Sequence, residues 1–111
     1  MSYKITRKNE AVTYTAPKHF DVRTTRLHNP VDVNEGKVTM GLSHFLPGGG
    51  CEFGSNAKES IYYIVSGEMD ITTEDGTTTL HAGDSFHCGP NTLKGIVNNG
   101  TESCQMLVVL A

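Results

Sequence analysis

Lys94 is the residue of this sequence whose type and position most clearly suggest a catalytic role. In the segment 93–99, Lys94, Ile96 and Asn98 alternate with their neighbours, so their side chains share one face of a predicted strand. If that face points into an apolar interior, burial disfavours the charged form of the lysine unless an acid pairs with it. A lysine held in its neutral form acts as a general base or forms a Schiff base with a carbonyl compound. The alternative is a lysine whose ammonium group extends to solvent.

Two histidines are candidates for proton transfer together with Lys94. His44 lies on the apolar face of its predicted strand, and His87 lies on a strand that leads into a proline turn. Histidine exchanges protons near neutral pH, so either residue is suited to general acid or base catalysis. The alternative for His44 is a hydrogen-bonded core residue, and the sequence leaves open which face His87 occupies. We expect the remaining histidines at the surface: His19, His28 and His81.

Glu59 and Glu52 are the acidic candidates. Glu59 directly precedes a predicted strand, where it either forms an ion pair with Lys94 or faces solvent. If His44 and His87 both point inward, one of these glutamates would complete a displaced metal site, most simply His44, His87 and Glu59. Imidazole nitrogens and a carboxylate together suit a transition metal.

The elements that must position these residues are short β-rich runs separated by Gly, Pro, Asn and Asp clusters, a pattern typical of a sandwich or small barrel. Residues 60–73 and 77–89 each hold two predicted strands around a turn, and single strands cover 11–15, 20–27, 37–46, 93–99 and 104–110. Pro47 to Gly50 is predicted to be a turn. Alternation places Val38, Met40, Leu42, His44 and Leu46 on one apolar face. Nine or ten strands in 111 residues predict a closed or nearly closed antiparallel barrel.

Composition restricts the class of protein. The 111 residues predict one domain with one core, and the net charge of -3 argues against a nucleic-acid binder. No apolar run is long enough to span a membrane, and the N-terminus lacks the apolar region of a signal peptide, so we expect no membrane contact and a cytoplasmic location. Three cysteines without a Cys-x-x-Cys pair indicate reduced thiols rather than a disulfide framework.

The two parts of the chain differ in regularity. Residues 1–36 are predicted to form N-terminal strands and a loop that pack on the barrel or on a dimer partner, and residues 37–111 form the barrel itself. The final strand is apolar on both faces from Met106 to Leu110. One face can meet the barrel core, but the other needs a cover, and in a small chain without helices that cover is a second subunit. We therefore expect a homodimer.

The order of elements resembles the cupin superfamily, an all-β barrel of jelly-roll type also called a double-stranded β-helix. Three stretches within about residues 38–110 carry the resemblance: "HFLPGGG", "ESIYYIVSGEMDITTEDGTTTL" and "HAGDSFHCGPNTLKGIVNN". The first matches the family's apolar strand and the Pro-Gly turn after it. The second matches the family's glutamate, apolar strand, Gly-Glu turn and hairpin, and the third matches the second family motif. The resemblance implies that the face of Lys94 lies inside the barrel. The motif spacing also places Tyr62 inside, where a phenol either donates a hydrogen bond to a substrate or serves as a core aromatic.

The family's usual metal ligands are mostly missing. The resemblance implies a His-x-His pair, a glutamate and a second-motif histidine, but no histidine falls in the range 53–58 where the pair belongs. The glutamate position falls on Ser60, and Glu59 would serve only if the strand is bulged there. Lys94 stands at the second-motif histidine position, and Asn98 matches the motif's asparagine. The usual metal site is therefore predicted to be lost, and the cofactor is unknown.

Three hypotheses follow for the function. The first is a barrel that binds a small polar carbonyl or carboxylate compound and acts on it without a metal, as an isomerase, epimerase or lyase with Lys94 and His44 or His87 as catalytic residues. Ligand binding would fall to Tyr62, Glu59, Glu52 and Asn98. The second is a binding or sensor protein that has kept the pocket without catalysis. The third is a metal-dependent oxygenase or hydrolase with relocated ligands.

Overall fold

A curled antiparallel sheet accounts for most of residues 2–111, the part of the chain that the computed structural model describes. Two short 3-10 helices, η1 (Lys8–Glu10) and η2 (Pro30–Asp32), interrupt the N-terminal region. The nine strands of this part are β1 (Val12–Tyr14), β2 (His19–His28), β3 (Thr39–Gly54), β4 (Ser60–Ser66), β5 (Glu68–Thr73), β6 (Gly76–His81), β7 (Ser85–Cys88), β8 (Lys94–Val97) and β9 (Cys104–Leu110). Neither helix has the length or the apolar character needed to cross a membrane.

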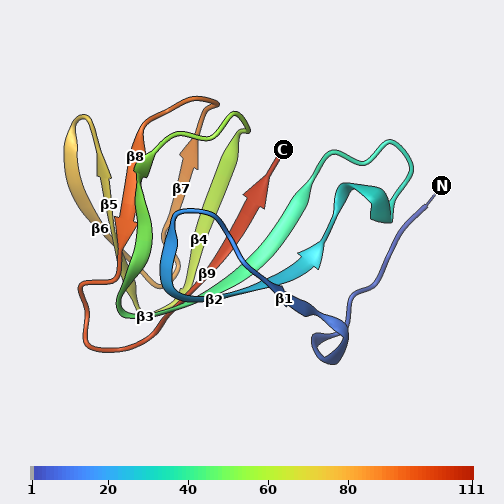
Figure 1. Cartoon of the computed structure of the whole chain (residues 1–111), viewed down its shortest axis with the longest axis horizontal. Helices are drawn as coiled ribbons and strands as arrows, with labels where there is room; N and C mark the ends of the chain where they lie inside the picture. Colours follow the sequence, from blue (N-terminus) through green and yellow to red (C-terminus); the bar gives the residue numbers. More distant parts are fainter. Residues whose placement is uncertain (1) are drawn as a thin grey trace.

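The sheet closes on itself into a nearly complete jelly-roll barrel, which confirms the predicted fold class (Figure 1). Its strands pair in the order β6-β5-β8-β3-β9-β4-β7. The strands at the two ends of this order, β6 and β7, are consecutive in the chain. Their connecting turn bonds to β4, since the backbone N–H of Gly83 donates to Ile64 O at 2.8 Å and that of Ile64 donates to Asp84 O at 3.0 Å.

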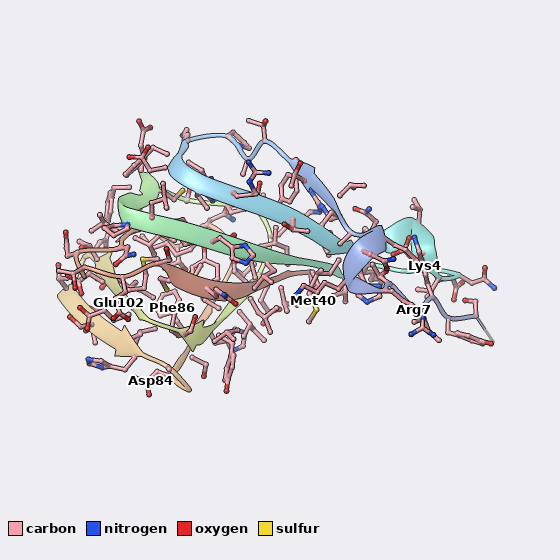
Figure 2. The ribbon with its side chains drawn as sticks, turned by 90° about the horizontal axis from the view of Figure 1, so that it is seen from below. Lys4, Arg7, Met40, Asp84, Phe86 and Glu102 are labelled. Carbon is pink, nitrogen blue, oxygen red and sulfur yellow. The ribbon has the colours of Figure 1, made fainter. Side chains whose placement is uncertain are left out.

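The N-terminal strands extend the barrel wall. β2 pairs with β3 over nearly its whole length, from His19 opposite Cys51 to His28 opposite Met40, with a bulge near each end. β1 then pairs with β2 and forms a hairpin with it. Figure 2 shows the segment with Lys4 and Arg7 at one end of the molecule and the barrel with Phe86 and Glu102 at the other.

A small apolar core fills the closed end of the barrel. Its members come from β3, β4, β5, β8 and β9 and are at most 5% exposed: Phe45, Ile64, Met69, Ile71, Ile96, Cys104 and Met106. These side chains are medium-sized, as expected for a chain without tryptophan. Because the core does not extend along the whole barrel, space remains between the strands toward the opposite end.

The segment Pro47 to Gly50 is a bend within β3 and not the predicted turn. β3 pairs with β9 up to Phe45, and from Gly50 onward it pairs with β8. Gly48 provides the bend with a φ of 87°, a conformation that residues with a Cβ rarely adopt. At Gly50 the strands approach so closely that a Cβ atom would lie 2.1 Å from Ile96 O. The glycine run therefore serves to transfer one continuous strand between two partners.

The alternation in β3 is as predicted, since Met40, Leu42, His44 and Leu46 share one face, but this apolar face is the outer side of the sheet. The buried side of this strand carries Thr39, Ser43 and Phe45, with Gly41 between them. Met40, Leu42, His44 and Leu46 lie on the outer side of the sheet, and Leu46 is 57% exposed. Alternation alone could not distinguish the faces because small residues line the inside, where they leave space, while apolar residues cover the outside.

We predict that Gly50→Ala lowers the free energy of unfolding by about 3 kcal/mol, because the added methyl group meets the β8 backbone and that backbone cannot move away cheaply. Gly89→Ala is the matched control, since the nearest atom to its Cβ is Thr92 Oγ1 at 3.8 Å. We expect the control to change the free energy by less than about 0.5 kcal/mol. Urea unfolding followed by circular dichroism measures both, and equal midpoints for the two variants would contradict the close approach of β3 and β8.

Candidate functional site

A cavity of about 380 Å³ lies inside the barrel, between the β1–β2 hairpin and strands β3, β4, β8 and β9. Its apolar floor is formed by Ile96, Met106 and Val108, and polar side chains from the hairpin and from β3 line its sides. A second hollow of about 260 Å³ lies on the surface beside Gly67 and Gly100. We take the first as the candidate site because it is larger, lies within the barrel and contains a buried charged side chain.

Lys94 is the buried charge. Its side chain is only 8% exposed, and it lines the cavity from the first residue of β8, opposite Gly54 of β3. Its Nζ lies 5.5 Å from the centroid of the Tyr62 ring, within the range of a cation–π contact. Among residues 2–111, no carboxylate forms an ion pair with this ammonium group. A buried charge without a protein partner is strongly destabilising, so the group is available to an anion that enters the cavity.

Tyr62 supplies a neutral hydrogen-bond donor beside this cation. Its ring packs at 5.9 Å against Phe86, which fixes the side chain toward the cavity. Burial raises the pKa of the Tyr62 hydroxyl well above its ordinary value, so the group stays protonated at physiological pH. Lys94 and Tyr62 therefore present two donors to one region of the cavity, as the motif spacing predicted for their faces.

Cys51 and Glu52 follow one another along the cavity edge. Burial raises the pKa of the Cys51 thiol, and the neighbouring Lys94 opposes this shift only in part. Cys51 is therefore a neutral thiol rather than a thiolate near neutral pH. Glu52 is an exposed residue at the cavity rim, and it is the one carboxylate among the described lining residues.

The N-terminal hairpin supplies six lining residues that were not predicted, and three of them carry an imidazole or a positive charge: Lys18, His19 and Arg26. His19, expected at the surface, lines the cavity and stacks on Phe45 at 6.5 Å between ring centroids. Its Nδ1 lies 2.7 Å from Pro17 O; since a carbonyl oxygen only accepts, Nδ1 carries a proton, and in the neutral ring Nε2 is then an acceptor. Lys18 and Arg26 add two positive charges, with Arg26 placed 4.0 Å from the Tyr14 ring centroid.

No pattern in the sequence reveals this contribution. It depends on the pairing of β2 with β3, which places His19 opposite Cys51 beyond the bulge between Phe20 and Val22.

His44 and His87 do not meet Lys94 in this structure. His44 lies on the outer side of β3, between Arg23 and Gln105 of the neighbouring strands, with its Nδ1 buried and unpaired among the described residues. His87 is exposed on β7, and its Nε2 lies 2.5 Å from Glu59 Oε2. Glu59 therefore pairs with His87 at the surface instead of with Lys94.

Asn98 is fully buried and holds the backbone in place. Its side-chain amide donates to Phe45 O at 3.3 Å and to Glu102 O at 2.8 Å, and its Oδ1 accepts from the Gly100 N–H at 3.0 Å. With these three bonds the amide ties the β8–β9 connection to β3. Asn98 does not line the cavity.

The residues at the family's metal position do not fit a cation. Lys94 and Ser60 stand where a histidine and a glutamate are usual, and Lys94 carries a positive charge that would repel a metal ion. Ser60 Oγ is buried without a hydrogen-bond partner among the described residues. Within residues 2–111, no three His, Cys, Asp or Glu side chains are grouped so that they could hold a metal. Of the alternative set, His87 and Glu59 pair with each other, but His44 lies apart from them on β3, so the three do not form a site.

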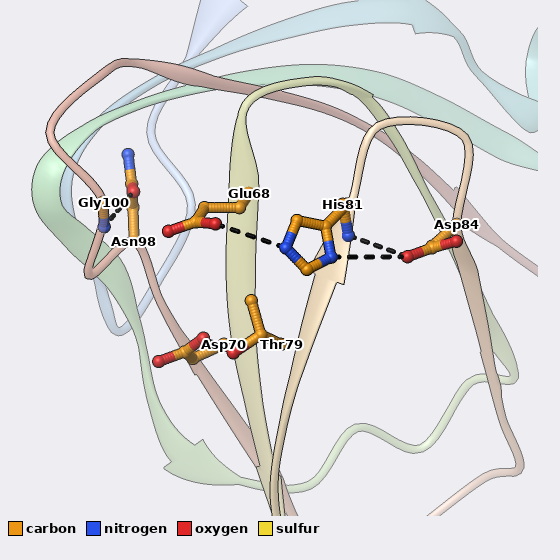
Figure 3. A network of polar contacts seen from close by, with 7 residues as sticks. All are labelled: Glu68, Asp70, Thr79, His81, Asp84, Asn98 and Gly100. Atoms are coloured by element: carbon orange, nitrogen blue, oxygen red, sulfur yellow. Dashed lines mark hydrogen bonds and ion pairs between the residues drawn. The ribbon is translucent and has the colours of Figure 1, made fainter.

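A polar network at the β5–β6 hairpin lies outside the cavity (Figure 3). His81 Nε2 lies 3.5 Å from Glu68 Oε2, and its Nδ1 lies 3.9 Å from Asp84 Oδ2. The His81 backbone N–H also donates to Asp84 Oδ2 at 2.8 Å. This arrangement stabilises the β6–β7 turn, and it agrees with the surface position predicted for His81.

Comparison with known proteins agrees with this architecture. The family model for the cupin domain matches residues 41–110. A curated relative, β-D-galactosidase Rv1717 of Mycobacterium tuberculosis, is 32% identical over 108 residues, which cover 97% of this chain and 93% of the relative.

Solved structures show the same fold at low identity. The polyketide cyclase RemF from Streptomyces resistomycificus superposes with a TM-score of 0.80 at 17% identity, covering 97% of this chain and 78% of that one. An RmlC-like cupin from Shewanella frigidimarina NCIMB 400 gives 0.78 at 16% identity, covering 98% and 90%. The family match, the extended similarity to the mycobacterial relative and the barrel itself agree: this chain belongs to the cupin family.

Proposed function

We propose that the barrel binds a small compound with a carboxylate or carbonyl group, which Lys94 contacts through its ammonium group. The observation that carries this proposal is the buried Lys94 side chain, which faces the cavity without an acid from the described chain. An anionic ligand would provide the missing charge and would recover the free energy lost when the ammonium group was buried.

The other lining residues support a negatively charged ligand. Lys18 and Arg26 join Lys94 around the cavity, against the single carboxylate of Glu52. This excess of positive charge favours entry of an anion. The Tyr62 hydroxyl would donate a hydrogen bond to a second oxygen of the same ligand, and the apolar floor of Ile96 and Met106 would contact its carbon atoms.

The same groups are suited to proton transfer on such a compound. A fixed ammonium group stabilises negative charge that develops on a carbonyl oxygen when a neighbouring C–H bond is broken. The Tyr62 hydroxyl stays protonated and can donate a hydrogen bond to that oxygen, and Nε2 of a neutral His19 ring can accept a proton, so a donor and a base line one cavity. Isomerase or lyase chemistry without a metal is therefore the activity that we assign to the site. The three free cysteines support a reducing, cytoplasmic setting for this protein.

We predict that Lys94→Met abolishes carboxylate binding and also stabilises the unliganded protein. Thermal unfolding with pyruvate, glyoxylate, oxalate and D-galacturonate provides the measurement. A ligand at a hundred times its Kd adds about 2.7 kcal/mol of stability, which raises the midpoint by roughly 10 °C for a domain of this size. Without ligand, replacing the buried cation by an apolar side chain should add about 1–4 kcal/mol.

Lys37→Met is the matched control for this prediction, because Lys37 is exposed and lies outside the cavity. It should retain both the binding and the stability of the original protein. Equal stabilisation of Lys94→Met and the original protein by a carboxylate would overturn the proposal. Stabilisation of the original protein by D-galactose, but by none of the four acids, would also overturn the proposal.

Glycoside hydrolysis is the second candidate function, favoured by the similarity to the mycobacterial β-D-galactosidase over nearly the whole of both chains. Most glycosidases use two carboxyl groups, one on each side of the scissile bond. Glu52 is the one described lining residue that could fill such a role. The structure supports this function less directly than anion binding, since the cavity offers more cations than carboxylates.

If hydrolysis is the function, Glu52→Gln should lower the rate on p-nitrophenyl β-D-galactoside by about 100-fold or more, because general acid catalysis is lost. Glu10→Gln, at an exposed residue of η1 far from the cavity lining, is the control and should leave the rate unchanged. Release of nitrophenol is followed by absorbance. If Glu52→Gln hydrolyses the substrate as fast as the control, Glu52 has no role in the mechanism. If the original protein does not hydrolyse the substrate at all, this second function is excluded.

A further inference from the structure

Arg26 is a second cation of the cavity without an acidic partner. It is half-buried on β2 and lines the cavity, and its guanidinium carbon lies 4.0 Å from the centroid of the Tyr14 ring. Among residues 2–111, no carboxylate forms an ion pair with this group and no oxygen accepts a hydrogen bond from it. An aromatic ring attracts a cation through its face and leaves the N–H donors of the guanidinium unused. These donors are therefore available to a ligand in the cavity.

Tyr14 holds the guanidinium group in position. The Thr24 hydroxyl donates to Tyr14 O, which ties β1 to β2. The Tyr14 side chain reaches over Gly41 of β3, where a Cβ atom would lie 3.2 Å from the tyrosine hydroxyl oxygen. Because Gly41 has no side chain, the ring can lie against the inner side of the sheet, and Arg26 stacks on it. A planar cation that is positioned before a ligand arrives loses little entropy on binding.

Arg26 and Tyr62 lie in one row across four adjacent strands. Tyr62 of β4 is opposite Val108 of β9, and Val108 is also opposite Gly41 of β3. Gly41 in turn is opposite Arg26 of β2. Directly opposite residues share one face of a sheet, and Tyr62, Val108 and Arg26 all line the cavity. Neighbouring strands are about 5 Å apart, so the Cα atoms of Arg26 and Tyr62 are no more than about 15 Å apart.

We propose that the ligand of this cavity is a short dicarboxylate, with one carboxylate bound by Lys94 and Tyr62 and the other by Arg26. This dicarboxylate proposal rests on the proposed function and adds a second acidic group to it. Guanidinium and carboxylate groups form two parallel charge-assisted hydrogen bonds, which suits Arg26 to the second position. The carbon chain of the ligand would cross Val108, which lies between the two ends of the row.

The span of the row limits the length of the diacid. The Arg26 and Tyr62 side chains and one hydrogen bond at each end occupy most of the distance between the two strands. The remaining space suits a diacid with about four to six carbon atoms. A side chain at Gly41 would obstruct this path, which is a further reason for a glycine in the row.

The charges around the cavity also favour a dianion. Three cations, Lys18, Arg26 and Lys94, face the single carboxylate of Glu52. One carboxylate of a ligand would leave a positive charge uncompensated, whereas a dicarboxylate compensates the whole excess. Complementary charge of this kind contributes mainly to the specificity of binding.

Isothermal titration calorimetry on the full chain tests the second carboxylate with two matched ligands. Glutarate carries two carboxylates, and monomethyl glutarate carries one on the same carbon chain. We expect the original protein to bind glutarate about tenfold more tightly or better, because hydrogen bonds to a charged group are stronger than those to an ester. Arg26→Met should bind the two ligands with similar affinity. Arg26→Lys, which keeps the charge but lacks the paired donors, should show an intermediate preference.

Arg23→Met is the matched control. Arg23 is an exposed arginine of the same strand, lies opposite His44 and is not part of the cavity lining. This variant removes the same charge and should keep the preference for glutarate. A preference lost equally in Arg23→Met and Arg26→Met would indicate a general effect of net charge and would overturn the proposed contact, as would a preference retained in Arg26→Met.

The same titrations separate this inference from the proposed function. Equal binding of glutarate and its monoester by the original protein would overturn the dicarboxylate and leave carboxylate binding intact. If the original protein binds neither ligand and none of the four acids named above, the proposed function fails as well. Circular dichroism checks that each variant is folded, and the preference is a ratio measured within one protein, so a loss of stability affects both ligands alike.

Discussion

The transfer of β3 from β9 to β8 is the constraint on which the rest of the barrel depends. A strand of sixteen residues can pair with two partners in succession only if it bends between them, and the bend requires the close approach at Gly50. Before the bend, β3 contributes Met40 and Leu42 to the outer side of the sheet and Phe45 to the core. After the bend, it contributes Cys51 and Glu52 to the cavity, and a bulge between Cys51 and Gly54 changes which alternate residues face inward. One backbone contact therefore determines the positions of two different surfaces.

Lys94 preserves the sign of the charge that the usual family site would hold. Where other members are expected to place a cation on histidine and glutamate ligands, this barrel places an ammonium group that is part of its own chain. The charge no longer depends on a metal supply or on a set of ligands, but it also cannot leave, so the empty cavity retains an unfavourable buried cation. Under the proposed function, the affinity for an anionic ligand and the stability of the unliganded protein are thereby opposed, which is common at functional sites.

Much of the fold and some of the site can be predicted from the sequence. Strand punctuation by Gly, Pro and Asn indicates the barrel, and the three motif stretches place Lys94 and Tyr62 inside it. Which face of β3 points inward could not be predicted, because apolar residues lie on its outer side, where polar residues are usual. The hydrogen-bond partners could not be predicted from the sequence either. Glu59 and His87 are 28 residues apart, for example, and meet only because β4 pairs with β7. Asn98 resembles a ligand residue in the motif, yet its amide is fully used by backbone groups.

The β1–β2 hairpin belongs to a part of the chain that the family model does not cover, yet it supplies His19, Lys18 and Arg26 to the cavity. The hydrophobic core and the strand crossing that hold the barrel together lie in the covered part. Substitutions in the hairpin can thus alter the charge and shape of the cavity without disturbing the residues on which folding depends. Under the proposed function, ligand preference is in that sense modular: it can diverge in this N-terminal hairpin while the barrel stays the same.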